Sequence, residues 1–394
     1  FMCALSQIIY LKIIKRGYSL SPLIGNFRKN ANITHLVVSS AQYFIIACLI
    51  VTLVEIAILK KYDTFTVRIL TLSSLFLSVG LLSVLAFRFL RWVRNRPDYL
   101  VIVYTAATIM IAANSLFVAL FISLEMQDVN SVISSSRAAI SSGNVSNFEL
   151  KEFQANLSLV PFVLFWIAST LLLRQYKRKW GAIKFYTILI IPLLYYFGIF
   201  QLILSNVFIQ YDILNTFQIY TFNVVNSILT RPVGGILFGI AFWIIARKIN
   251  ERNISGYMKF AALGIMLLSI SNEDAGLYLL PYPPFGLPTI TFVGISSYLL
   301  LVGIYYSAIS TSQDNKIRSL IKKSVEEQLK FVSEIGTSQM EQEIQSKVKD
   351  LTRRSAKKLE EDSGIEIPMQ TQEMDEYIKT AIHEVQKITK GKNG

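Results

Sequence analysis

Long apolar blocks, separated by short clusters of Lys and Arg, are the feature that most constrains this chain. A soluble core does not need apolar segments of such length, whereas the ~30 Å hydrocarbon layer of a bilayer takes about 20 helical residues to cross. Composition agrees, because 53% of the residues are hydrophobic and only 16% are charged, against roughly 25% charged in an average soluble domain. The pattern predicts an all-α, polytopic membrane protein.

Eight blocks predict eight spanning helices, followed by a charged helical tail. The expected spans are approximately 36–59, 65–87, 99–124, 157–174, 183–206, 226–246, 257–280 and 288–311. We therefore divide the chain into a segment 1–35, a transmembrane bundle 36–311 and an amphipathic tail 312–394. In residues 1–35 the apolar stretch precedes its basic residues, the reverse of a signal peptide. This segment is expected to be the end of a truncated upstream span, or an interfacial segment, with a basic cytoplasmic stretch.

The distribution of basic residues predicts the orientation of the spans. With the amino-terminal side placed in the cytoplasm, the cytoplasmic segments of 1–311 hold 18 Lys and Arg and the outer segments hold 5. Basic residues accumulate on the cytoplasmic side of membrane proteins. We therefore expect a multi-pass protein of the cell membrane, with its tail in the cytoplasm.

The net charge of +13 does not indicate a nucleic-acid partner. Residues 312–394 are neutral, with 15 basic and 15 acidic residues, so the whole excess flanks the predicted spans. A nucleic-acid surface would instead concentrate charge on one face of a folded soluble domain. The partner that this charge pattern predicts is the lipid bilayer.

Apolar residues recur at helical spacing in the tail. One stripe runs from Ile317 to Ile335, and Gly336 is expected to end its helix. Ser338 precedes Glu341 by three residues, which favours a capping box at the start of a second helix. A third helix is expected over about 372–389. Stripes this narrow bury little area alone, so residues 312–394 are expected to pack on each other, on a second copy as a coiled-coil homodimer, or on a cytoplasmic protein partner.

The longest outer loop is expected at 125–156, rich in Ser and Asn. It contains the triplet Asn144-Val-Ser, a glycosylation sequon. The loop is interpreted as a linker, with a lid as the alternative.

Ionisable groups within a span are costly and mark candidate functional sites. Arg231 in span six and Glu273 in span seven each lie 16 residues from the cytoplasmic end of their span, Arg247 and Tyr257 respectively. At 1.5 Å per residue both lie at the same depth, about 24 Å above the inner surface. Arg231, Glu273 and the adjacent Asp274 thus form either a buried ion pair that locks the two spans or an outward-facing polar pocket for a ligand or ion.

Additional polar positions in the spans are weaker candidates, namely Glu55, Asn114 and Asn226. Gly234, Gly235 and Gly239 follow Arg231 and are expected to let a neighbouring helix approach closely. The sequence shows no catalytic motif, no metal-ligand spacing around its two Cys and two His residues, and no cofactor fingerprint. We predict no cofactor and no enzymatic activity.

The stretch YPPFGLPTITFVGISSYLLLVGIYYSAISTSQDNKIRSLIKKS (282–324), with IGTSQMEQEI (335–344), resembles uncharacterised multi-spanning membrane proteins of ammonia-oxidising archaea. The resemblance covers mainly the last third of the chain and implies an archaeal membrane location.

Two functions fit the sequence. The first is a receptor-like sensor or scaffold for signalling, in which the bundle is coupled to a cytoplasmic partner through the tail. The alternative is a transporter or channel for a small solute or ion, using Arg231, Glu273 and Asp274.

Overall fold

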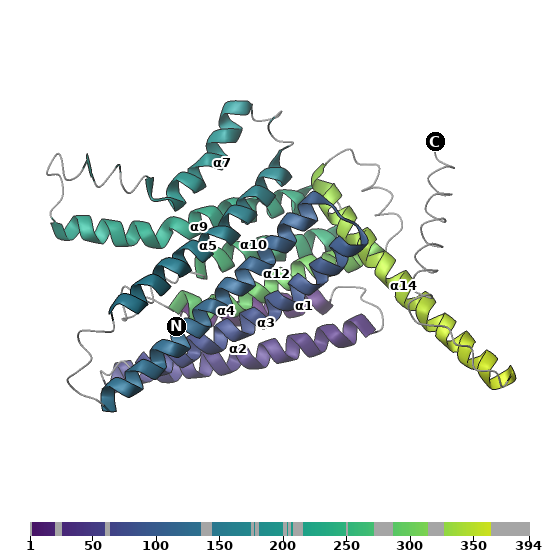
Figure 1. The fold of residues 1–394 in the computed structure, drawn as a ribbon, viewed down its shortest axis with the longest axis horizontal. Coiled ribbons are helices and arrows are strands. Elements are labelled where there is room, and N and C mark those ends of the chain that lie inside the picture. Colours follow the sequence, from purple (N-terminus) through teal and green to yellow (C-terminus); the bar gives the residue numbers. More distant parts are fainter. Residues whose placement is uncertain are drawn as a thin grey trace.

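A bundle of long helices makes up the computed structural model (Figure 1). The structure describes residues 2–19, 26–59, 64–134, 144–174, 177, 181–199, 203, 206–207, 216–249, 251–271, 287–313 and 327–363. These residues contain no strand. The helices are α1 (Met2–Ser19), α2 (Asn26–Leu59), α3 (Thr64–Asn95), α4 (Tyr99–Ser134), α5 (Asn144–Leu173), α7 (Ala182–Tyr196), α9 (Thr216–Lys248), α10 (Arg252–Ser271), α12 (Leu287–Gln313) and α14 (Glu327–Ser363). The all-α class predicted from the sequence is confirmed for this part of the chain.

Five of the described helices are long and apolar enough to cross a bilayer. Their candidate spans are Asn32–Glu55, Thr66–Asn95, Tyr99–Leu124, Asn253–Ser271 and Thr289–Ser312, and shorter apolar helices occupy Leu157–Leu173 and Ala182–Tyr196. Large apolar side chains on the outside of the bundle agree with a lipid environment. Examples are Leu36, Phe44, Val51 and Ile58 of α2 and Phe76 and Phe87 of α3, each at least half exposed. A water-soluble monomer rarely leaves so much contiguous apolar surface uncovered.

The helix α12 lies at the centre of the bundle. Its span is 89% buried, against 33% for the span of α2. It packs on α10, α3, α14, α1 and α2. The contact with α10 is close because both helices offer glycines: a Cβ on Gly303 would lie 2.3 Å from the backbone nitrogen of Ala261, and one on Gly264 would lie 2.6 Å from that of Leu300. Small residues bring helix backbones together in this way in membranes.

The glycines of α9 act as predicted. A Cβ on Gly235 would lie 2.3 Å from the Cβ of Ser269 on α10, and one on Gly239 would lie 2.1 Å from the Cγ of Met266. Gly234 lies against the ring of Phe162 on α5. The helices at predicted spans six and seven, α9 and α10, are neighbours with glycines of α9 at their contact, as expected.

Two expected boundaries were wrong. The span expected at 183–206 is interrupted, because α7 ends at Tyr196 and Gly198 adopts a φ of 67°. Gly198 donates its backbone N–H to the carbonyl of Tyr195, a turn that glycine favours because it lacks a Cβ. The loop expected at 125–156 is also shorter, because α4 continues to Ser134 and α5 begins at Asn144.

Candidate functional site

The first half of α14 is seated on one end of the bundle, where α3 and α12 end and α4 begins. In Figure 1 this helix does not continue along the axis of α12 but crosses the end of the bundle and then projects beyond it. We call the surface that receives it the α14 seat. It is formed by residues of α3, α4, α9 and α12.

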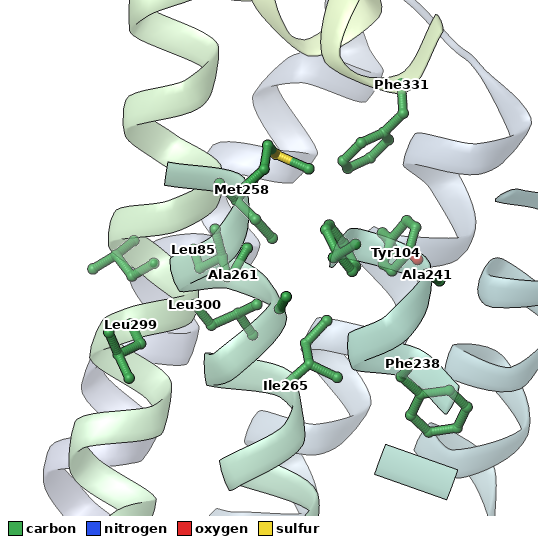
Figure 2. Packing of buried hydrophobic residues seen from close by; sticks show 14 of the residues in the cluster. Leu85, Tyr104, Phe238, Ala241, Met258, Ala261, Ile265, Leu299, Leu300 and Phe331 are labelled. Carbon is green, nitrogen blue, oxygen red and sulfur yellow. The ribbon is translucent and has the colours of Figure 1, made fainter. Parts of the chain in front are cut away.

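The apolar part of the α14 seat is an aromatic cluster that receives Phe331. The ring of Phe331 is completely buried. Its centroid lies 5.1 Å from that of Tyr104 on α4 and 6.0 Å from that of Phe242 on α9. Figure 2 shows Phe331 reaching down from α14 toward Tyr104. Val332 and Ile335 are also fully buried, so α14 contributes directly to the main core of the bundle.

A glycine allows α14 to lie directly on α12. A Cβ on Gly336 would lie 2.5 Å from the Cγ2 of Thr311 and 2.6 Å from its Cβ. The sequence-based prediction that Gly336 ends one helix and Ser338 caps the next was therefore wrong. α14 runs unbroken from Glu327 to Ser363, and Ser338 is buried within it. Glycine weakens an isolated helix, but here it permits a close contact that a side chain would prevent.

Polar contacts surround the apolar part of the seat. The indole Nε1 of Trp92 donates a hydrogen bond of 3.1 Å to the Oε1 of Gln339, and Trp92 is fully buried. Gln339 in turn donates from Nε2 to Oε1 of Glu343 at 3.2 Å, and the hydroxyl of Ser312 donates to the same oxygen at 3.4 Å. The contact therefore joins the ends of α3 and α12 through one short network on α14.

Arg96 bridges two carboxylates of α14. Its NH1 atom lies 3.2 Å from Oε2 of Glu334, and its Nε atom lies 3.4 Å from Oε1 of Glu341. The two glutamates are seven residues apart, about two helical turns, so both face α3. The side chains of Glu334 and Glu341 are only 21% and 10% exposed, which reduces screening by solvent. The sequence indicated Arg96 only as a topology marker, and nothing in its spacing predicted these partners.

The charged cluster predicted in spans six and seven lies outside what the structure describes. Arg231 belongs to α9, but its side chain is not among the described ones, and Glu273 and Asp274 fall outside the described residues. The side chains of Asn144 and Asn226 are likewise outside them. Asn114 of α4 is completely buried, and Glu55 is half-buried near the end of α2.

A small cavity lies away from the α14 seat, between α4, α5, α7, α9 and α10. Its volume is about 40 Å³, and it is lined mainly by rings, with the hydroxyls of Ser158 and Tyr196 3.2 Å apart at one side. One water needs roughly 10–15 Å³ measured in this way, so the cavity has room for a few waters rather than a substrate. Among the described residues, no group of His, Cys, Asp or Glu could hold a metal ion.

Comparison with known proteins gives no family or fold to which the chain can be assigned: no family model, no curated protein and no solved structure matches it.

Proposed function

We propose that this chain is a non-enzymatic, multi-pass protein of the cell membrane, with eight spans, whose bundle is coupled through α14 to a protein partner in the cytoplasm. It would act as a sensor or a scaffold. The observation that carries this proposal is the α14 seat, because one helix after the last span contacts the ends of α3, α4, α9 and α12 together.

The seat supports coupling because α14 contacts spans that are far apart in the sequence. The segment 334–343 of α14 contacts Trp92 of α3, Arg96 directly after α3, and Thr311 and Ser312 of α12. If α3 moves relative to α12, the bond between Trp92 and Gln339 and the close contact at Gly336 cannot both be kept. Packed contacts of this kind shift between discrete arrangements rather than deform smoothly.

The second half of α14 supports a partner surface. Ile344 is 42% exposed and Leu351 is 63% exposed. From Ile335, which faces the bundle, to Ile344 there are nine residues, or two and a half helical turns, so Ile344 lies on the opposite side of the helix. Leu351 is two turns further along on the same side as Ile344. The exposed apolar positions thus point away from the seat, which favours a helix of another protein as their partner.

Site-specific photocrosslinking in cells tests the proposal. A benzophenone amino acid in place of Leu351 should crosslink to one defined protein, and the same group in place of Ile58, on the apolar outer side of α2, serves as the matched control and should not. If the only crosslinked product contains two copies of this chain, the partner is a second copy and the protein is a homodimer. Labelling of lipid only, from both positions, would overturn the proposal.

A transporter or channel for a small solute or ion is the second candidate. The observation that favours it is the close packing of α9 on α10. Arg231 belongs to α9, and Glu273 and Asp274 follow the end of α10 in the sequence. Solute uptake by proteoliposomes that is lost in Arg231→Ala but kept in Arg247→Ala, at the end of α9, would favour transport over coupling.

A further inference from the structure

Two glutamines are completely buried in the part of the bundle formed by α1, α2, α3 and α12. Gln7 of α1 and Gln42 of α2 each have an exposed fraction of 0%. Neither the amide nitrogen nor the amide oxygen of either side chain has a hydrogen-bond partner among the described residues. The hydroxyl of Thr291 on α12 is also completely buried and also has no hydrogen-bond partner among the described residues. A buried amide or hydroxyl without a partner costs about 1–3 kcal/mol, so three together need a physical explanation.

Gln42 and Thr291 face the same stretch of α12, and Gln7 lies on α1, which packs on that helix. The amide nitrogen of Gln42 lies 2.6 Å from the point where a Cβ on Gly294 would be, and the hydroxyl of Ser74 on α3 lies 3.6 Å from the same point. Gln7 lies about one helical turn before Tyr10, whose ring meets that of Phe292 edge-on at 6.5 Å. Residues 291–294 of α12 therefore collect polar groups from α2 and α3, while α1 packs on the same helix; α1, α2 and α3 lie side by side in Figure 1.

Polar groups continue from this point along α12 and its neighbours. The hydroxyls of Ser78 and Ser297 are 2.6 Å apart, and Nδ1 of His35 lies 3.2 Å from the hydroxyl of Tyr298. From Thr291 to Tyr298 the line covers about 10 Å along the helix. It reaches the first turns of the candidate span of α2, where His35 lies. The amides thus lie at one end of a polar line that runs to the start of the candidate span of α2.

The chemistry of the amides and hydroxyls selects an uncharged ligand. Gln7, Gln42, Ser74 and Thr291 offer both donors and acceptors but no formal charge, and a buried ion without a counter-charge is costly. We propose that α1, α2 and α12 hold a binding site for small uncharged molecules that donate and accept hydrogen bonds, of which water is the smallest. Gly294 is essential to this site because any side chain there would displace the amide of Gln42. The site lies apart from the α14 seat and does not depend on the proposed function.

Thermal unfolding of the full chain in nanodiscs tests whether the amides are occupied. The variants are Gln7→Leu, Gln42→Leu and the double substitution, and Tyr43→Leu, at an exposed position next to Gln42, is the matched control. If both amides bind a shared molecule, each single substitution lowers the melting temperature, and the double lowers it by less than the sum. If the amides are orphaned, each Leu raises the melting temperature and the effects add, which overturns the proposal.

Radiolytic labelling with water as the probe tests the occupant directly. Water bound at the site yields hydroxyl radicals that oxidise the nearby Phe292, so the wild type should be labelled there, Gln42→Asn should retain the label, and Gln42→Leu should lose it. Lowered melting temperatures without labelling of the wild type would identify a larger uncharged molecule, which supports the same site. Equal labelling of Phe292 in wild type and Gln42→Leu would contradict the site, as would folded Leu variants with unchanged stability.

Discussion

Trp92 and Gln339 are hydrogen-bonded at 3.1 Å although 247 residues separate them in the sequence. The bond joins the end of α3 to a helix that follows the last candidate span, inside a contact from which Trp92 is wholly excluded from solvent. A donor and an acceptor buried in this way depend on each other, because the loss of one leaves the other unpaired.

Trp92→Phe should therefore destabilise the protein by about 1–3 kcal/mol, since the phenyl ring fills most of the space but leaves the Oε1 of Gln339 without its donor. The free energy of unfolding in mixed micelles measures the effect. Trp243→Phe, at a 41% exposed position of α9, is the matched control and should change stability little. Equal losses in the two variants would mean that the bond in the seat contributes nothing.

Arg96→Ala should release the first half of α14, because Glu334 and Glu341 lose their shared cation while remaining mostly covered. A partly exposed bridge of this kind contributes about 1 kcal/mol, so the fraction of time that α14 is undocked should rise roughly fivefold. Limited trypsin digestion of α14 measures this as a faster cleavage rate. Arg94→Ala, two residues away and exposed, is the control, and a rate that rises as much for Arg94→Ala would refute the role given to Arg96.

Gly303→Ala should be strongly destabilising. Its Cβ would fall 2.3 Å from a backbone nitrogen of α10, and backbone cannot move aside as the end of a side chain can. The melting temperature in detergent should fall far more than for Gly80→Ala in α3, where nothing lies within 4 Å of the added Cβ. Similar melting temperatures for the two variants would show that α10 and α12 do not approach as described.

The general architecture could be predicted from the sequence, because long apolar blocks have few alternatives to spanning helices. The glycines of α9 were also correctly interpreted, since Gly234, Gly235 and Gly239 fall on an apolar helix where only packing explains them. The role of Gly336 was predicted wrongly because the local sequence around a glycine in a charged helix is the same whether the glycine ends the helix or allows another helix to pack closely. Its role depends on the contact with Thr311, which lies in a different helix.

The candidate site was not predictable for a similar reason. Arg96 is one of several arginines at the end of α3, and nothing in the local sequence distinguishes it from Arg94. Its partners come from α14, and a single sequence carries no record of which distant residues meet. Gln7 and Gln42 were not singled out because the sequence does not show whether a glutamine is buried or has a partner, and only the structure shows both amides fully buried, with that of Gln42 beside Gly294.

The orientation of the chain is tested by labelling intact cells. The predicted topology places 18 basic residues on the cytoplasmic side and 5 outside. If it holds, a tag at Asn144 should be reached by an impermeant reagent from outside, and a tag at Lys390 only after permeabilisation. Both sites labelled from the same side would contradict the eight-span topology.

The coupling of α14 to the bundle is the central claim, and hydrogen–deuterium exchange of the full chain in nanodiscs tests it most directly. Within the single helix α14, the amides of 331–341 should exchange as slowly as those at the end of α3, because Phe331, Gly336 and Gln339 are held in the seat. The amides of 344–355 should exchange much faster, because large side chains of this half such as Ile344 and Leu351 are exposed. Uniformly fast exchange along the whole of α14 would mean that the helix is not seated on the bundle, and would contradict the account.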